Sequence, residues 1–291
     1  MTGATGLVGR ALVRSLQKDG IEVASFSRDP SKLPASEHGR RWPPRADDVA
    51  LDAVVHLLGE PVAGRWSDAK KKAIVSSRID GTRLLVDAIR ALPPAERPRV
   101  LVSASAIGVY GDRGDEELRE DASVAHDFLA DVCAGWEREA LAAESLGVRV
   151  VCVRIGLVMS HEGGALKAML LPFRMGLGGS MGPGTQWWPW IHLDDLVGLV
   201  RFAIDHDTLR GPVNATAPTP VRQREFAATL ARVLGRPAFI PAPSFALRTA
   251  LSGFAEELLA SRRVVPFAAQ SAGFSFRFRE LEPALRDAAV R

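Results

Sequence analysis

Three glycines at the start of the chain constrain its fold more than any other feature. Gly3, Gly6 and Gly9 are spaced three residues apart in MTGATGLVGR, and apolar residues at helical spacing follow from Ala11 to Lys18. In such a turn the first glycine permits a tight bend, the second lets the backbone approach a pyrophosphate, and the third lets the helix pack on a sheet. Exposed amides and the helix dipole favour the phosphate charge. We expect a dinucleotide-binding loop, the alternative being a merely flexible one.

The first half of the chain alternates strand and helix patterns. Strands are expected at 21–27, 50–59, 99–108 and 148–156, and helices at 11–18, 66–92 and 127–146. The strands are almost continuously apolar, which is typical of a parallel sheet covered on both faces. Ser67 is the expected N-cap of the long helix, and Pro93 and Pro94 end it. The prediction is an α/β fold with a doubly wound parallel sheet of strand order 3-2-1-4-5-6.

The pattern changes after Gly156. A glycine-rich irregular stretch covers 163–184, and a helical stretch, a short strand and a further helix follow at 190–205, 212–217 and 221–234. We predict a dinucleotide-binding Rossmann domain over 1–160. A smaller α+β substrate lobe over 161–291 is expected to thread back toward it.

Composition excludes several classes of protein. Apolar residues make up 47% and charged residues 24%, which is ordinary globular usage. The net charge is only +3, and the compact basic cluster Lys70–Lys72 lies beside Asp68, so we expect a solvated helix face and no nucleic-acid partner. Cys133 and Cys152 lack metal-ligand spacing, so buried thiols and no metal site are expected. No signal-peptide pattern and no apolar run near ~20 residues is present, which predicts a cytoplasmic protein without a membrane partner.

The end of the second strand predicts the cofactor. Sites that prefer NAD usually carry Asp or Glu there for the ribose hydroxyls, whereas this chain has Ser27 and Arg28. A serine can hydrogen-bond a 2′-phosphate, and a guanidinium can pair with it and stack on adenine. This favours NADP(H); the alternative is an ordinary surface arginine.

Several motifs resemble a known family. TGATGLVGRAL, GTRLLVDAI, SASAIGVYGD and WIHLDD resemble the extended short-chain dehydrogenase/reductases, the sugar-nucleotide epimerase and dehydratase group. HLLGEPVAGRW, FLADVCAGWE, LPFRMGLGG, GPVNATAP and the tail VVPFAAQSAGFSFRFRELEPAL resemble one atypical branch, often called "epimerase family protein" and sometimes given a SulA-like label. The tail, about 240–288, is similar to that branch's C-terminal domain of unknown function. The resemblance covers essentially the whole chain and implies a small-molecule substrate; a homodimer is expected by analogy only.

The family's usual proton-transfer pair is missing. Ordinary members use a serine and a Tyr-x-x-x-Lys pair, in which the lysine and the nicotinamide ribose lower the pKa of the tyrosine. The single tyrosine here is Tyr110, and four residues later stands Gly114. The resemblance places Leu129 and Cys133 where the tyrosine and lysine belong. The usual mechanism is therefore in doubt, as it is for the whole branch.

Two residues are candidates for chemistry. Ser105, before the Val-Tyr-Gly motif, is expected to hydrogen-bond a carbonyl, and Glu60, at a strand end near the nicotinamide ribose, to orient a hydroxyl or act as a base. Arg154 is expected to face the same cleft and hold an anionic group. The expected cofactor-binding residues are Gly3, Thr5, Gly6, Leu7, Val8, Gly9, Ser27, Arg28, Leu58, Gly59, Glu60, Ser103 and Arg154.

Other residues carry open alternatives. Tyr110 and Cys133 are expected to be structural rather than reactive. His192 is expected to be a structural hydrogen-bonder, with Asp194 or Asp195 capping the following helix. The tryptophans at 187, 188 and 190, after a glycine-rich loop and Gln186, either form a lid over a ring-containing ligand or join the two lobes.

Only Met1 and Thr2 precede the glycine turn, although the strand before it is central in this fold. Unmet buried hydrogen bonds cost ~1–3 kcal/mol each, and several would exceed a total stability of ~5–15 kcal/mol. We therefore expect about five apolar, β-branched residues ahead of Met1 in the natural product. A chain that starts at Met1 is expected to bind cofactor weakly. The functional expectation is an NADP(H)-binding reductase or epimerase, the rivals being a cofactor-dependent sensor or scaffold and, less well fitted, an assembly protein.

Overall fold

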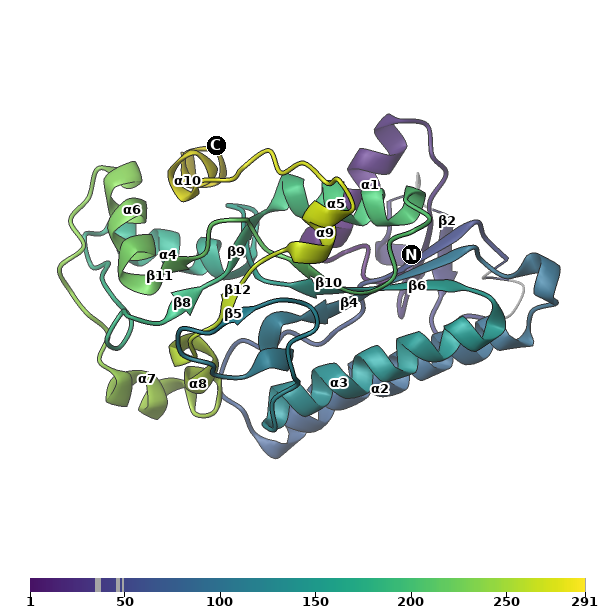
Figure 1. Cartoon of the computed structure of the whole chain (residues 1–291), viewed down its shortest axis with the longest axis horizontal. Coiled ribbons are helices and arrows are strands. Elements are labelled where there is room, and N and C mark those ends of the chain that lie inside the picture. The colour runs from purple at the N-terminus through teal and green to yellow at the C-terminus, as the bar shows by residue number, and fades with distance from the viewer. Residues whose placement is uncertain (35–37, 46–47, 49, 291) are drawn as a thin grey trace.

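The computed structural model describes the chain from Met1 to Val290, except for residues 35–37, 46, 47 and 49. Its centre is a parallel sheet (Figure 1) in the order β2, β1, Thr2, β3, β4, β6 and β10. The strands are β1 (Ala24–Ser27), β2 (His38–Arg41), β3 (Ala53–His56), β4 (Val100–Ala106), β6 (Arg149–Ile155) and β10 (Gly211–Ala215). With Thr2 counted as the first strand, the chain order across the sheet is 3-2-1-4-5-6-7. The predicted doubly wound fold is confirmed, with one further strand at its edge.

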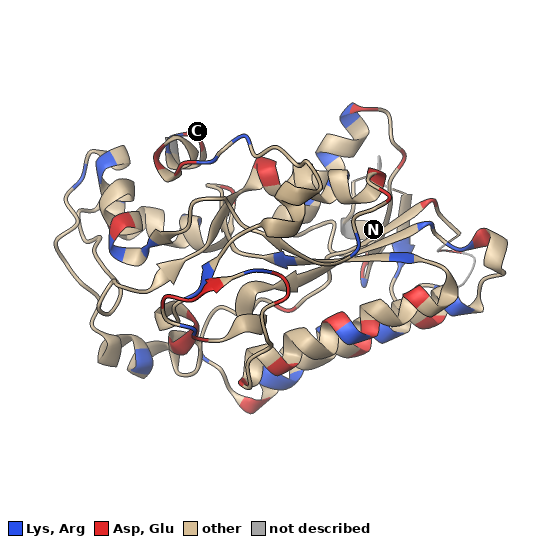
Figure 2. Ribbon diagram, viewed as in Figure 1, with Lys and Arg blue, Asp and Glu red and all other residues tan. Residues whose placement is uncertain are grey.

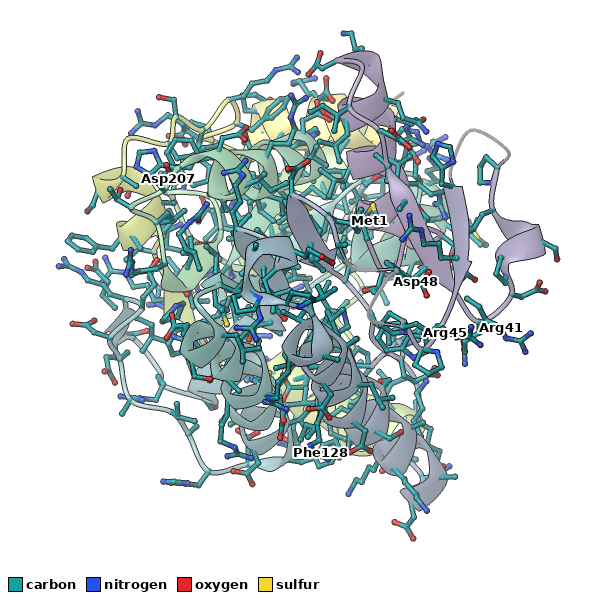
Figure 3. The ribbon with its side chains drawn as sticks, turned by 90° about the vertical axis from the view of Figure 1, so that its right-hand side faces the viewer. Met1, Arg41, Arg45, Asp48, Phe128 and Asp207 are labelled. Atoms are coloured by element: carbon teal, nitrogen blue, oxygen red, sulfur yellow. The ribbon has the colours of Figure 1, made fainter. Side chains whose placement is uncertain are left out.

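Met1 and Thr2 occupy the central strand position. The N–H of Thr2 donates to the carbonyl of Val55 (2.9 Å), and the N–H of Phe26 donates to the carbonyl of Met1 (2.8 Å). Met1 lies beside these strands in Figure 3. A cavity of about 430 Å³ lies next to it, lined by the first residues of β1 and β3. The residues expected ahead of Met1 remain a prediction.

Helices cover both faces of the sheet. The helices α1 (Leu7–Lys18) and α5 (Leu193–Asp205) pack on one face, and α2 (Asp68–Ala91) and α3 (Phe128–Leu141) on the other. Ser67 caps α2 by accepting the N–H of Lys70 (3.2 Å), as predicted. Because a Cβ at Gly135 would lie 2.6 Å from Ile79, the missing side chain lets α3 approach α2 closely. The outer faces of both helices carry charges of both signs (Figure 2).

A second core lies beyond the carboxyl ends of the strands. It is built around buried residues of α4 (Gly164–Arg174), α6 (Gln223–Leu234) and α10 (Leu281–Val290), with the short strands β7 (Leu157–Met159), β8 (Trp187–Trp188), β9 (Trp190–His192) and β11 (Val221–Arg222). Trp188 and Trp190 are 3% and 0% exposed inside this core. These two tryptophans are therefore core residues and do not form a lid over a ligand.

The boundary expected near residue 160 does not separate the cores. α5 and β10 lie beyond that point in the sequence, yet they pack with α1 and the main sheet. The tail also returns to the first half of the chain, because β12 (Arg263–Val264) pairs in parallel with β5 (Glu117–Leu118). Its other elements are α7 (Ser244–Leu251), α8 (Phe254–Leu259) and α9 (Phe267–Ser271), and short 3₁₀ turns lie at η1 (Pro30–Lys32), η3 (Pro94–Glu96), η4 (Ile107–Tyr110) and η5 (Ala142–Leu146). Each helix in the described ranges is too short or too polar to cross a bilayer.

Candidate nucleotide-binding and active site

The glycine turn is too crowded to hold side chains at two of its three glycines. Gly3 has a φ of +70°, and a Cβ there would lie 2.6 Å from the carbonyl oxygen of Leu57. A Cβ at Gly9 would lie 2.1 Å from the carbonyl oxygen of Gly3. The turn therefore fits tightly between α1 and the residue after β3. This is the switch point of a doubly wound sheet, where the strand order reverses and ligands bind.

The N-terminus of α1 is open to an anion. Gly6 is its N-cap and has no side chain to accept the first amides, and the first turn carries no acidic residue. The first turn of any helix leaves its N–H groups without intrahelical acceptors. Among the described residues no side chain caps the N–H groups of Leu7, Val8 and Gly9. A glycine cradle beside uncapped amides fits a phosphate group.

Ser27 and Arg28 lie where β1 ends, as predicted. The Ser27 hydroxyl donates to the carbonyl of Asp29 (3.0 Å) and accepts its N–H (3.1 Å). Arg28 is exposed, and its positive charge helps to lower the pKa of Glu60. Arg28 is thus the more available of the two groups for a phosphate.

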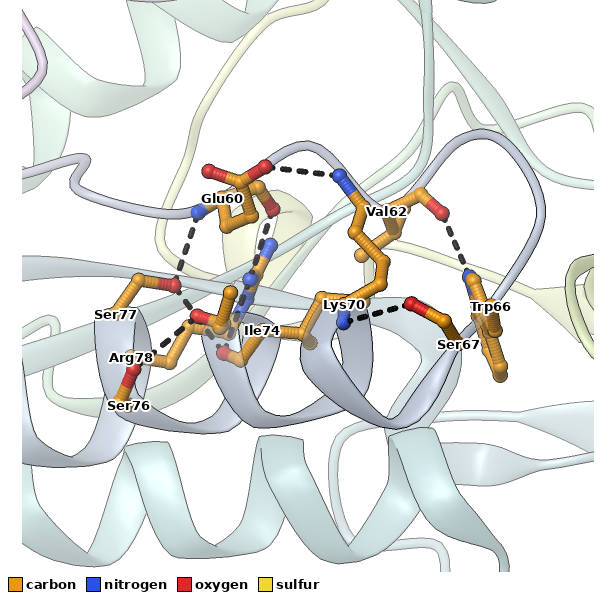
Figure 4. A network of polar contacts seen from close by, with 10 residues as sticks. Glu60, Val62, Trp66, Ser67, Lys70, Ile74, Ser76, Ser77 and Arg78 are labelled. Atoms are coloured by element: carbon orange, nitrogen blue, oxygen red, sulfur yellow. Dashed lines mark hydrogen bonds and ion pairs between the residues drawn. The ribbon is translucent and has the colours of Figure 1, made fainter.

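Glu60 is fixed by contacts with α2 (Figure 4). Its carboxylate lies 2.8 Å from Lys70 Nζ, its N–H donates to Ser77 Oγ (2.9 Å), and its carbonyl accepts from Arg78 Nη1 (3.0 Å). The hydrogen bond from Lys70 lowers the pKa of Glu60 below its ordinary value. The carboxylate is ionised at neutral pH, and because its lowered pKa makes it a weaker base, it suits the role of orienting a hydroxyl better than that of a base.

We did not predict from the sequence that Arg78 lies against Gly59 and Glu60. A Cβ at Gly59 would lie 3.1 Å from Arg78 Nη2, so the glycine makes room for the guanidinium. Its Cζ lies 5.1 Å from the Trp136 ring, and burial lowers the pKa of Arg78. A signal existed in the sequence, because Arg78 lies one helical turn from Ile74 and from Thr82 on the buried stripe of α2.

The structure places Ser105 and Arg154 in a buried network rather than a cleft. Ser105 Oγ donates to Glu137 Oε1 (2.6 Å), and Arg154 binds both carboxylate oxygens of Glu137 (2.8 and 2.9 Å). Arg154 Nη1 also donates to the hydroxyl of Tyr110 (2.8 Å), which itself donates to Asn214 Oδ1 (2.7 Å). Although burial alone lowers the pKa of Arg154, the ion pair raises it above the ordinary value.

This geometry corrects two expectations. Ser105 is 2% and Arg154 5% exposed, and both are committed to Glu137. An arginine already paired in the interior does not hold an anion in a cleft, and a serine that donates to a carboxylate has no proton left for a carbonyl. Ser103 is 1% exposed and donates to the carbonyl of Ala104 (3.3 Å), so its expected cofactor role gains no support either. Leu58 is partly buried and lies against Gly81 of α2.

Tyr110 and Cys133 are both enclosed. Burial raises the pKa of each to about 12. Tyr110 is 0% and Cys133 3% exposed, which agrees with the structural roles preferred for them. His192 rather than an aspartate caps α5, because its Nδ1 accepts the N–H of Asp194 (3.1 Å).

The fold and the glycine turn define a dinucleotide-binding protein of the Rossmann class. The sequence profile described as "NAD dependent epimerase/dehydratase family" matches residues 1–215, and a domain of unknown function, DUF1731, matches 242–288. The chain belongs to the NAD-dependent epimerase/dehydratase family and carries the C-terminal domain of unknown function that its tail resembled.

Several relatives match nearly the whole chain. The "Epimerase family protein SDR39U1 homolog, chloroplastic" of Arabidopsis thaliana is 40% identical, covering 98% of this chain and 85% of the relative. "Epimerase family protein YfhF" of Bacillus subtilis is 36% identical, covering 98% and 95%. The crystal structure of human epimerase family protein SDR39U1 (isoform 2) with NADPH has a TM-score of 0.88 at 34% identity, covering 99% of this chain and 98% of that one. The predicted NADP(H) cofactor agrees with the family's description and with this human relative.

Proposed function

We propose that this chain is an NADP(H)-dependent oxidoreductase or epimerase that acts on a small polar or nucleotide-linked substrate without a Tyr-x-x-x-Lys pair. The observation that carries the proposal is the glycine cradle: Gly3 and Gly9 exclude side chains where α1 presents uncapped amides. When bound, a nicotinamide nucleotide supplies or accepts a hydride at its ring.

The chain's own residues have distinct roles in this proposal. The amides of Leu7, Val8 and Gly9 hold the diphosphate, and Thr5 lies exposed at the same turn. Arg28 pairs with the 2′-phosphate. Gly59 and Glu60 flank the nicotinamide ribose, where the ionised Glu60 accepts a hydrogen bond from a hydroxyl.

Substitution of Gly3 tests whether the glycine turn holds the diphosphate. Gly3→Ala places a methyl group 2.6 Å from the Leu57 oxygen at a positive φ, so the turn must shift. Strain of about 1–3 kcal/mol corresponds to roughly 5- to 150-fold weaker binding of NADPH, measured by fluorescence titration. Gly20→Ala is the matched control, because Gly20 also has a positive φ (+75°) but open space around it. Unchanged NADPH affinity in Gly3→Ala would contradict the proposed cradle.

One observation favours a second candidate, a cofactor-dependent sensor or scaffold without turnover. Leu129 and Cys133 stand at the places of the proton-transfer pair, and the Cys133 thiol is buried with its pKa raised to about 12. A screen of carbonyl compounds for NADPH oxidation separates the two. NADPH binding without turnover of any compound would favour the sensor.

A further inference from the structure

A cavity of about 520 Å³ lies between the beginning of α3 and the tail. Phe128 and Leu129 line it from α3, and Glu257 and Arg262 line it from α8 and the segment that follows. Leu129 is the residue that stands where the family's tyrosine belongs. The place of the absent pair therefore borders this cavity, and both halves of the chain supply its polar groups: Lys71, Asp112 and Asp127 from the first half, and Glu256, Glu257 and Arg262 from the tail.

Glu257 brings a carboxyl group to this place. Its side chain is 17% exposed, and its Oε2 lies 2.8 Å from Arg262 Nη2. A Cβ at Gly108, in the turn that follows β4, would lie 3.9 Å from the same oxygen. Among the described residues no hydrogen bond to Glu257 Oε1 is found, and that oxygen is not among the buried atoms that lack a partner. One oxygen is thus anchored, and the other is available to a ligand in the cavity.

The tail is anchored so that Glu257 keeps this position. Arg262 is 5% exposed, and its Nε donates to the carbonyl of Gly111 (2.8 Å). Ser261 donates its N–H to Asp112 Oδ1 (3.1 Å) and its hydroxyl to the carbonyl of Gly114 (2.6 Å). β12 then pairs with β5. A side chain held from several directions is a pre-organised group rather than a mobile surface carboxylate.

The charges around Glu257 allow it to hold a proton. Burial raises the pKa of Glu257, the nearby carboxylate of Asp127 raises it further, and Arg262 opposes both. Cys133 also lies close to Glu257, but as a neutral thiol. Arg248 is paired with Glu256 at 2.9 Å, and Lys71 lies over the Phe128 ring at 5.4 Å. Once Glu257 has lost its proton, the Arg262 guanidinium stabilises the carboxylate.

We propose that Glu257 transfers the proton at the oxygen of a carbonyl or alcohol substrate in this cavity, in place of the family's tyrosine. This inference rests on the proposed function, which supplies the nicotinamide nucleotide. In the reductive direction the carbonyl carbon gains a hydride from NADPH and the carbonyl oxygen gains the proton of Glu257. The products are an alcohol, NADP⁺ and the Glu257 carboxylate, which regains a proton from water. Arg262 is a positioning residue.

The test uses the full chain and two aldehyde probes, 4-nitrobenzaldehyde and glyceraldehyde. Glu257→Gln keeps the shape of the side chain and its contact with Arg262 but removes the ionisable proton. We expect the rate of NADPH oxidation to fall by about 100-fold or more, with NADPH affinity within about twofold of wild type. Glu257→Asp should retain part of the rate. Glu280→Gln, an exposed glutamate of the same tail, is the matched control and should match wild type.

A second readout, the pKa of Glu257 measured by NMR, does not depend on turnover. In the NADPH complex, carboxyl ¹³C NMR should show Glu257 titrating above its ordinary value of 4.5. Because the protonated form is the donor, the rate of reduction should fall as pH rises through that pKa, and Glu257→Gln should lack this limb.

Three results would overturn the inference: Glu257→Gln retaining the wild-type rate, a Glu257 pKa at or below 4.5, or no reduction of either probe by protein that binds NADPH. The last result leaves the NADPH-binding part of the proposed function standing. Failure to bind NADPH at all would instead overturn the proposed function itself.

Discussion

His56 is locked in one protonation state by two threonines. The Thr82 hydroxyl donates to the carbonyl of Arg78 (2.6 Å), so it accepts from His56 Nε2–H at 3.0 Å. His56 Nδ1 is then left as an acceptor for the Thr2 hydroxyl at 2.9 Å, while Thr2 Oγ1 accepts the N–H of Leu57 (3.1 Å). These hydrogen bonds link Thr2, just before the glycine turn, to Thr82 of α2 through the neutral imidazole of His56.

We expect stability to fall in acid because of His56. Burial lowers its pKa from 6.5 to about 3. Between these two pH values His56 is protonated in the unfolded chain and neutral in the folded one. Its contribution to the free energy of unfolding is therefore complete above pH 6.5 and is lost as pH falls toward 3. The free energy of unfolding then falls by up to about 1.4 kcal/mol per pH unit. Urea unfolding across this pH range measures the effect as the difference in free energy of unfolding between wild type and His56→Asn. An NMR titration of His56 near its ordinary pKa would contradict the assignment.

The Glu137–Arg154 pair is expected to stabilise the fold and not to bind ligand. Removing one partner of a buried ion pair leaves a charge without compensation and costs about 3–5 kcal/mol. Glu137→Gln and Arg154→Met should each lower the free energy of unfolding by roughly that amount. NADPH affinity of the folded protein should not change. If Arg154→Met weakened NADPH binding while stability stayed intact, the anion-holding role first expected for Arg154 would be restored.

At the scale of elements, the hydrophobic pattern predicted the sheet well because most of its strands are buried. β4 and β6 read as apolar runs, and the capping of α2 by Ser67 follows from local chemistry. β2 was missed, because this edge strand has the polar sequence HGRR and is mostly exposed. α1 begins at Leu7, four residues before the helical spacing was recognised, since Gly6 is its N-cap.

The cavity beside Met1 gives an element-scale prediction. It lies at the starts of β1 and β3, where a strand leading into Thr2 would pair with both. An engineered extension of about four β-branched residues ahead of Met1 should fill it and raise the free energy of unfolding by at least about 2 kcal/mol. An extension of equal length made of glycine and serine is the control. Equal melting temperatures for the two extended proteins would contradict this account of the cavity.

At the scale of the whole molecule, the glycine turn and the strand end at Arg28 were predictable from the sequence, whereas the proposed reaction side was not. Gly3 lies in the glycine turn and Arg28 directly follows β1, and both positions can be recognised from the residues around them. Glu257 and Arg262 reach the site only because the tail folds back onto the turn at Gly111, a contact between residues 151 positions apart. Ser105 was misassigned because the sequence does not show which face of β4 meets Glu137 of α3.

Calorimetric titration of NADPH and NADH tests the central claim most directly. The account predicts one NADPH bound per chain with a dissociation constant in the micromolar range, about −8 kcal/mol. NADH should bind at least about tenfold more weakly, and Arg28→Ala should remove that difference, because the guanidinium would have no 2′-phosphate partner in NADH. A well-folded protein that gives no heat with either nucleotide at roughly millimolar concentration, about −4 kcal/mol, would contradict the account.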